Sequence, residues 1–258
     1  MTSFVLKIIA MVTMVIDHSG DIFFPILGNN TLYFNAIGRI AFPLFCFMLV
    51  EGYKHTSNLK KYMLRLFIGA LISQIPFQIL VVNYMHAKPF AINVLFTLLF
   101  GLFALSIWDY KLPNKEEKQN KDIDNNKYSF TINDVFIWIV KIILIALLII
   151  IASFANFDYG NVGIILILAI FLLFKKGKII SKIAFLIILI GLSIFNYRQA
   201  IIDALPWGIT FVITASIVPF IFMCLYNGKK GPNTKYGLYV IYPLHLIILE
   251  LLRHFFMA

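Results

Sequence analysis

Charged side chains are scarce in this sequence. Asp, Glu, Lys and Arg make up 13% of its 258 residues, whereas 61% are hydrophobic and the mean hydropathy is +0.89. Soluble domains are about 45–50% apolar, because a surface in contact with water needs polar side chains. The composition therefore excludes an ordinary soluble domain and predicts an all-α polytopic membrane protein, a bundle of helices that cross the bilayer.

Cysteine is almost absent as well. Cys46 and Cys224 both lie in apolar stretches, where cysteine packs as a small buried residue. The sequence also lacks a His, Cys or carboxylate set with metal-ligand spacing, and it lacks the basic segment and cleavage pattern of a signal peptide. We therefore expect no disulfide and no metal site, and we expect the first apolar run to remain as a span.

Apolar runs with polar interruptions predict nine spans. They lie at about 4–22, 33–53, 61–83, 90–109, 133–154, 161–174, 180–196, 205–226 and 238–256. At roughly 20 residues for each crossing, these spans use nearly the whole chain. The sequence thus predicts a single transmembrane domain over residues 1–258. The stretch at about 110–132 is rich in Lys, Asn, Asp and Glu, which predicts a mobile cytoplasmic loop.

Basic residues alternate between the predicted loops. The loops near 54–65, 110–132, 175–182 and 227–237 hold 4, 5, 4 and 3 Lys or Arg residues, whereas those at 20–32 and 155–160 hold none. Cytoplasmic loops of membrane proteins are enriched in Lys and Arg. The net charge of +10 is therefore interpreted as a topology signal and not as a sign of a nucleic-acid partner. We expect a cytoplasmic N-terminus and an outer C-terminus.

Ionisable groups inside the predicted spans are concentrated near the N-terminus. A charge at a helix centre costs about 2.5–3.5 kcal/mol on insertion scales, so each one predicts a partner or a function. Asp17 and His18 are neighbours in the first span, and Arg39 precedes Pro43 by four residues in the second. Proline has no N–H, so a kink is expected there. The topology puts Asp17, His18 and Arg39 in the outer half of the membrane, and we expect an Asp17–Arg39 ion pair.

Three interpretations of this group stay open. In the first, it is a buried ion pair that orients two helices, and hydrogen bonds satisfy His18. In the second, His18 is a general base or an acyl-accepting nucleophile, and Asp17 fixes its tautomer. In the third, the group belongs to a transport pathway for protons or ions.

A second polar cluster lies at the cytoplasmic edge of the second and third predicted spans. Its members are Lys54, His55, Thr56, Lys60, Lys61 and Arg65. Lys and Arg bind phosphates, and neighbouring hydroxyl groups add hydrogen bonds, so the cluster fits a nucleotide-like donor. It fits ordinary anchoring against anionic lipids equally well.

Polar side chains also occur within later spans. Helix packing through small and hydrogen-bonding residues accounts for Ser73, Gln74 and Asn93. In the last span, Tyr242 and His245 place a second imidazole within the membrane, where structural and functional roles are both open.

Six stretches together resemble the TraX family of membrane proteins, named for a conjugation-system protein associated with N-terminal acetylation of pilin. They are LKIIAMVTMVIDHSG at 6–20, IGRIAFPLFCFMLVEGYKHTSNLKKYMLRL at 37–66, SQIPF at 73–77, NVLFTLL at 93–99, FDYGNVG at 157–163 and YPLHLIIL at 242–249. The resemblance covers both ends and the middle of the chain. It implies a multi-pass protein of the bacterial cytoplasmic membrane.

The resemblance also implies an enzyme, an acyl-CoA-dependent acyltransferase. Acetyl-CoA or another acyl-CoA would be the cytoplasmic donor, and an amine or hydroxyl on the outer side, such as the N-terminus of a peptide or pilin-like protein, the acceptor. The CoA phosphates would lie near Lys54, His55, Thr56, Lys60, Lys61 and Arg65. His18 would act as base or nucleophile, supported by Asp17, with Arg39 stabilising the oxyanion. Ser73, Gln74, Asn93, Tyr242 and His245 would line the substrate cavity.

Two other functions remain as alternatives. A proton-coupled transporter or flippase would use Asp17, His18, Arg39 and His245 as an ion pathway. A non-catalytic membrane scaffold would use the same polar groups only for helix packing. The absence of an internal repeat weighs against the common inverted-repeat transporter folds.

Overall fold

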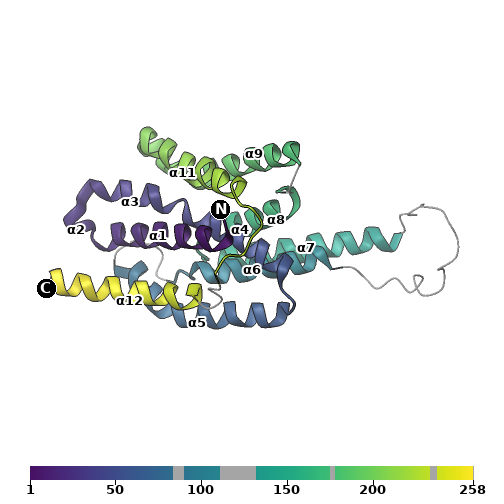
Figure 1. The fold of residues 1–258 in the computed structure, drawn as a ribbon, viewed down its shortest axis with the longest axis horizontal. Coiled ribbons are helices and arrows are strands. Elements are labelled where there is room, and N and C mark those ends of the chain that lie inside the picture. The colour runs from purple at the N-terminus through teal and green to yellow at the C-terminus, as the bar shows by residue number, and fades with distance from the viewer. Residues whose placement is uncertain (84–89, 111–131, 175–177, 233–236, 258) are drawn as a thin grey trace.

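The computed structural model describes residues 1–83, 90–110, 132–174, 178–232 and 237–257, and within these ranges it contains helices and no strands. The helices are α1 (Ser3–Ile22), α2 (Phe24–Leu27), η1 (Gly28–Asn30), α3 (Thr31–Gly38), α4 (Ala41–His55), α5 (Leu59–Asn83), α6 (Val94–Asp109), α7 (Ile132–Phe154), α8 (Gly160–Leu173), α9 (Ile179–Asn196), α10 (Arg198–Asp203), α11 (Leu205–Cys224) and α12 (Gly237–Met257). Figure 1 shows the long helices packed alongside one another, with α12 beside α1 and α5.

Each of the nine predicted spans corresponds to a helical segment of the structure. Among the residues that the structure describes, seven segments are long and apolar enough to cross a membrane, with α2 to α4 counted as one; α6 and α8 are apolar but shorter. The prediction of an all-α polytopic membrane protein is confirmed. The predicted mobile loop at about 110–132 lies, apart from its two end residues, outside the described part of the chain.

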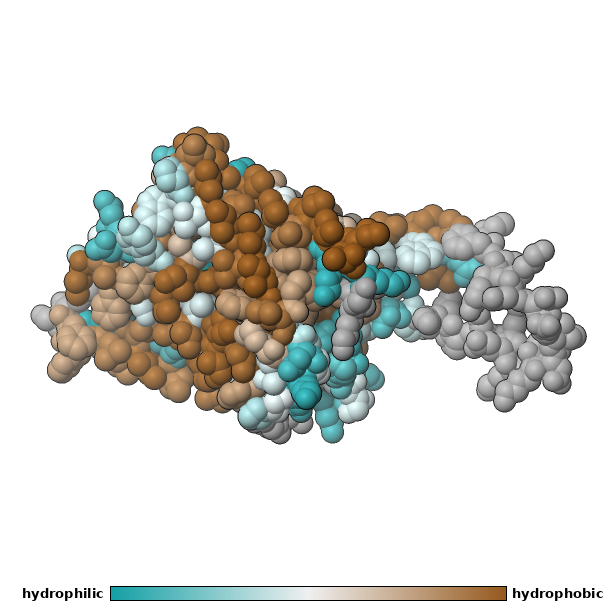
Figure 2. Space-filling view, turned by 45° about the horizontal axis from the view of Figure 1, so that its top comes forward, coloured by the Kyte–Doolittle hydropathy of each residue, from teal (hydrophilic) through white to brown (hydrophobic). Residues whose placement is uncertain are grey.

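The outer surface of the bundle is apolar. The most hydrophobic segment, residues 134–154 of α7, is also the least buried: only 11% of its most apolar 18-residue stretch is buried inside the protein. Figure 2 shows a broad hydrophobic face across the bundle. Exposed apolar patches of this extent are not stable in water, whereas lipid tails cover them without cost.

The second predicted span is broken at Arg39 and Ile40, which separate α3 from α4. Pro43 lies in the first turn of α4, where the missing N–H would have had no helical partner. The predicted kink is therefore confirmed. Because the helix is interrupted here, the Arg39 side chain can lie against α1.

Glycines allow the central helices to approach closely. A Cβ on Gly38 of α3 would lie 2.2 Å from Cγ of Asp17 in α1, and one on Gly101 of α6 would lie 2.1 Å from Cδ1 of Ile167 in α8. Small residues serve this purpose in membrane bundles, where packing and not water exclusion holds helices together. The α1–α3 contact brings the carboxylate of Asp17 next to the break at Arg39.

Two short helices leave room inside the bundle. The 16 residues of α6 and the 14 of α8 rise only about 24 Å and 21 Å, less than the ~30 Å hydrocarbon core. Non-helical backbone at 155–159 precedes α8 and is tied to Ile92 by two backbone hydrogen bonds of 3.1 and 2.8 Å. Irregular backbone is tolerated in membrane proteins only where it is buried or lines a cavity.

We expect Gly38→Ala to lower the thermal midpoint of the protein in detergent, because the added methyl group would push Asp17 out of its position. Overpacking of this kind costs about 1–3 kcal/mol. Gly191→Ala in α9 is the matched control, since a Cβ there meets no atom within 4 Å. An equal effect of the two changes would contradict the close α1–α3 contact.

Candidate functional site

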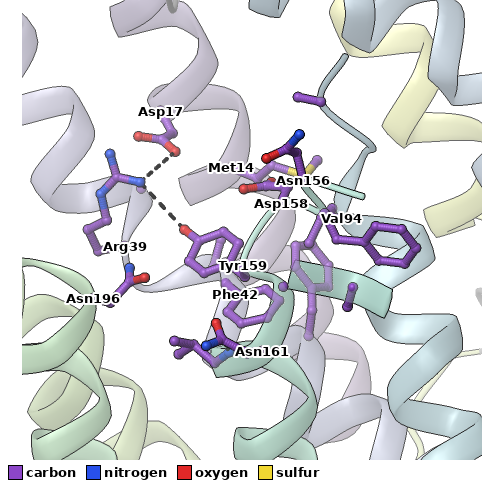
Figure 3. Close-up of a pocket in the computed structure, with 18 of the residues that line it drawn as sticks. Met14, Asp17, Arg39, Phe42, Val94, Asn156, Asp158, Tyr159, Asn161 and Asn196 are labelled. Atoms are coloured by element: carbon purple, nitrogen blue, oxygen red, sulfur yellow. Dashed lines mark hydrogen bonds and ion pairs between the residues drawn. The ribbon is translucent and has the colours of Figure 1, made fainter. Parts of the chain in front are cut away.

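A cavity of about 570 Å³ lies among α1, α4, α6, α8 and α12 (Figure 3). Its polar lining residues are Asp17, His18, Arg39, Ser153, Asn156, Asp158, Tyr159, Asn161, Asn196, Arg198 and Tyr242. Its apolar wall includes Met14, Phe42, Phe45, Phe77, Ala91 and Val94. Residues from both ends of the sequence and from its middle therefore meet around one space.

The predicted ion pair between Asp17 and Arg39 is confirmed. Nη1 of Arg39 lies 3.7 Å from Oδ2 of Asp17, and it donates to the hydroxyl of Tyr159 at 3.5 Å. Figure 3 shows the guanidinium between these two partners. The rings of Tyr197 and Phe211 lie 5.5 and 5.7 Å from the guanidinium carbon, within range of cation–π attraction. One hydrogen-bond donor, Nε of Arg39, is buried without a partner among the described residues.

A second acid and an amide extend this cluster. With its amide nitrogen oriented to donate, Asn35 lies 3.1 Å from Oδ1 of Asp17 and 3.2 Å from Oδ1 of Asp21. The carboxylate of Asp17 is therefore held between an amide on α3 and the guanidinium at the helix break. Two fixed neighbours restrict the orientation of the Asp17 carboxylate.

His18 makes its hydrogen bond with His245. Nδ1 of His18 lies 2.7 Å from Nε2 of His245, and the two ring planes differ by 9° with centroids 5.0 Å apart. A centroid separation this much longer than the N···N distance places the rings edge to edge in one plane, which is the geometry of a ring-to-ring hydrogen bond. Nδ1 of His245 lies 2.9 Å from the carbonyl oxygen of Ile241. A role for Asp17 in orienting His18 stays a prediction.

Of the other residues expected to line a substrate cavity, Tyr242 does so, and His245 adjoins the cavity through His18. Ser73, Gln74 and Asn93 are not among the residues that line the cavity; Gln74 and Asn93 instead form a network between α5 and the start of α6, and Ser73 bonds within α5. The Asn93 amide donates to Gln74 Oε1 and to the Ala70 carbonyl, both at 2.8 Å, and Asn93 Oδ1 caps α6 by accepting from Leu95 N at 3.0 Å. Ser73 donates to the Gly69 carbonyl at 2.6 Å. The network of Gln74 and Asn93 lies beside the wall that Phe77, Ala91 and Val94 form.

The predicted donor-binding cluster lies at the other end of α4. Lys54 pairs with Glu51 at 3.0 Å and His55 approaches the same carboxylate at 3.8 Å, while Lys60 and Lys61 are exposed. Thr56 follows the last residue of α4, and Arg65 of α5 lies 5.9 Å from the Tyr62 ring. Phe45 is the last residue of α4 that lines the cavity, and the nine-residue step from it to Lys54 corresponds to about 14 Å of helix.

The segment at 155–159 contributes residues that sequence reasoning missed. Asp158 lines the cavity, and its carbonyl accepts a hydrogen bond from the hydroxyl of Thr97. Tyr159 has a left-handed backbone (φ 58°) that turns its ring onto Phe42, with centroids 3.8 Å apart. The available signal was an acid, Asp158, in a loop without basic residues between two strongly apolar runs.

Removing either charge of the Asp17–Arg39 pair is expected to destabilise the fold, because the remaining charge is left buried. We expect Asp17→Asn or Arg39→Gln alone to lower the free energy of unfolding by about 3 kcal/mol. This is the lower end of the usual loss for a broken buried ion pair, because the two side chains keep 13% and 19% of their surface exposed. The double variant should lose less than the sum of the two singles. Unfolding by SDS titration in mixed micelles measures all three.

The Glu51–Lys54 pair, whose lysine is exposed, provides the control. Lys54→Gln should cost less than about 1 kcal/mol, as the loss of an exposed partner does. Strictly additive losses for Asp17 and Arg39 would show that the two charges do not stabilise each other.

Comparison with known proteins gives a family over nearly the whole chain. The model of the TraX protein family matches residues 3–253. A protein of Dichelobacter nodosus described as "Probable fimbrial assembly protein FimC, serogroup H1" is 30% identical over 261 aligned residues, which cover 96% of this chain and 94% of the relative. No solved structure matches the chain. Since the family match extends from the first helix to the last, the chain belongs to the TraX family.

Proposed function

We propose that this protein is a membrane-embedded acyltransferase that moves an acyl group, such as acetyl, from cytoplasmic acyl-CoA to an acceptor on the outer side. The observation that carries the proposal is a cavity in which a hydrogen-bonded imidazole, His18, lies near a fixed guanidinium, Arg39. Acyl transfer needs a base for the acceptor and donors for the oxyanion. Both requirements are met by residues that line this cavity.

The reaction would proceed with a simple transfer of protons. The acceptor nitrogen or oxygen attacks the thioester carbonyl while Nε2 of His18 takes its proton. Nη groups of Arg39 and the hydroxyl of Tyr159 are the candidate donors to the negative carbonyl oxygen. The carbon–sulfur bond then breaks, and the proton on His18 passes to the leaving thiolate of CoA.

Asp158 supports an amine as the acceptor. Its carboxylate belongs to the lining of the cavity that contains His18, and Asn156 and Asn161 add amide groups to the same lining. A carboxylate there would attract an ammonium group and accept one of its protons, and the neutral amine that remains would be oriented by hydrogen bonds for attack on the thioester. A peptide N-terminus has this chemistry.

The relative from Dichelobacter nodosus suggests the setting of the reaction. Its printed name is that of a probable fimbrial assembly protein. We therefore propose a pilus-related role for the present chain, with a pilin-like protein or peptide as the acceptor.

The donor would enter from the basic cluster at the far end of α4. Exposed Lys60 and Lys61 would bind the phosphates of CoA. Between this cluster and the cavity, Cys46, Leu49 and Val50 of α4 are buried. The acyl arm therefore has to part these side chains, so donor binding is expected to widen the space along α4.

Donor binding is tested by the replacement Lys60→Gln with Lys61→Gln. The loss of two phosphate contacts should raise the Kd for acetyl-CoA about 10-fold or more, as measured by calorimetry on the purified protein. The matched control is Lys229→Gln with Lys230→Gln, another exposed adjacent pair, in the segment between α11 and α12. Equal Kd values for acetyl-CoA in the two double variants, or no acetyl-CoA binding to folded wild type, would contradict the proposed donor site.

The catalytic role is tested by His18→Ala. We expect this variant to bind acetyl-CoA normally but to transfer acetyl groups to an acceptor peptide at least about 100-fold more slowly, the usual contribution of a general base. Acetylation is followed by mass spectrometry. Retained transfer would remove His18 from the mechanism, whereas lost expression would indicate a structural role.

We also propose that the N-terminus and the basic cluster face the cytoplasm. In a background of Cys46→Ser and Cys224→Ser, Asn29→Cys at the opposite end of α1 should react with a membrane-impermeant maleimide added to spheroplasts. Lys60→Cys should react only after lysis, since both positions are exposed in the fold. The reverse labelling pattern would invert the topology and the direction of transfer.

A further inference from the structure

A chain of hydrogen bonds runs from the backbone of α12 to the imidazole on α1. Nδ1 of His245 lies 2.9 Å from the carbonyl oxygen of Ile241, and Nε2 of His245 lies 2.7 Å from Nδ1 of His18. Both rings are at most 9% exposed. The chain therefore connects a fixed backbone acceptor to a side chain that lines the cavity.

The direction of each hydrogen bond follows from the chemistry of the groups. A carbonyl oxygen only accepts, so Nδ1 of His245 carries a proton. A neutral imidazole has one N–H, so Nε2 of His245 is an acceptor and Nδ1 of His18 is the donor to it. The proton of neutral His18 is thus on Nδ1, and its Nε2 carries the free lone pair.

The other candidate for orienting His18 is occupied. The carboxylate of Asp17 pairs with Arg39 and lies within hydrogen-bond distance of the Asn35 amide. Its neighbour His18 is bonded to a different helix, α12. The groups that serve as base and as orienting partner therefore come from the first and last helices.

We propose that His245 is a positioning residue, which together with the Ile241 carbonyl holds His18 in the tautomer with Nδ1 protonated and Nε2 free to accept a proton. The inference rests on the proposed function, in which His18 is the base. A histidine with the opposite tautomer would present an N–H to the acceptor and could not deprotonate it.

His245 also has a role during the transfer step. When Nε2 of His18 takes the proton of the acceptor, Nδ1–H remains bonded to Nε2 of His245. The positive charge then lies within a charge-assisted hydrogen bond between coplanar rings, which is stronger than a neutral one. When the proton passes on to the leaving thiolate, both imidazoles return to their starting tautomers, and no proton is gained or lost by His245.

Imidazole ¹⁵N chemical shifts test the tautomer directly in the full-length protein, labelled at histidine and held in detergent micelles. The signals of His18 are identified by their loss in His18→Asn. In wild type we expect a protonated Nδ1 and an unprotonated Nε2. His245→Leu removes the acceptor of the His18 Nδ1–H, so the proton of His18 should move to its Nε2, the tautomer that free histidine favours. His245→Gln places a side-chain oxygen near the position of the His245 Nε2, so the proton of His18 should stay on Nδ1.

A wild-type His18 with its proton on Nε2 would overturn the inference, as would an unchanged tautomer in a folded His245→Leu variant. If His245→Leu does not fold, the wild-type and His245→Gln spectra test the inference, which requires the His18 proton on Nδ1 in both. These spectra require no acyl-CoA, so they test the tautomer of His18 even if the protein transfers no acyl group. In that case the proposed acyltransferase function is wrong, and the tautomer assignment can still be correct.

Kinetics add a readout that a purely structural role would not produce. His245→Leu should lower kcat at least about 10-fold with KM for acetyl-CoA unchanged, and His245→Gln should recover most of the loss, because tautomer control affects the transfer step and not donor binding. A loss that appears only in KM, or equal losses in both variants, would contradict a positioning role.

Discussion

Burial of the Arg39 guanidinium is the constraint on which much of this structure depends. A charge inside a membrane bundle has to find its partners within the protein, and here they come from three places in the sequence: Asp17 of α1, Tyr159 before α8 and Tyr197 at the end of α9. The break between α3 and α4 makes this convergence possible, because it places Arg39 against α1. Gly38 permits the close approach that the pair requires.

The cavity beside this pair follows from helix length. The two short helices α6 and α8 do not fill the thickness of a bilayer core, and the connection at 155–159 between α7 and α8 follows an irregular path that lines the cavity. Polar groups gather on that path because backbone that leaves the helix needs new hydrogen-bond partners, of which Ile92 and Thr97 supply several. A cavity with both polar and apolar walls is the result.

Two features of this space support acyl transfer over a purely structural role. The ring of His18 is held in one plane with a second imidazole, and the guanidinium of Arg39 lines the same cavity, where its Nη groups are the candidate oxyanion donors of the proposal. Membership of the TraX family and the similarity to a probable fimbrial assembly protein agree with a pilus-related membrane protein, the setting in which we propose the reaction.

The sequence by itself determined the helical membrane class, the order of the spans, the kink before Pro43 and the Asp17–Arg39 pair, because apolar run length, proline chemistry and the cost of a buried charge are local properties. It also marked His18 and His245, but not as partners. Only the tertiary structure decided that α12 packs on α1 so that these rings share a hydrogen bond, that Asp158 and Tyr159 line the same cavity, and that Gln74 and Asn93 form a network beside its wall. Contacts between residues more than 100 positions apart depend on which helices are neighbours. In a bundle, side-chain packing over whole helix faces determines these neighbours, and no local sequence pattern shows the result.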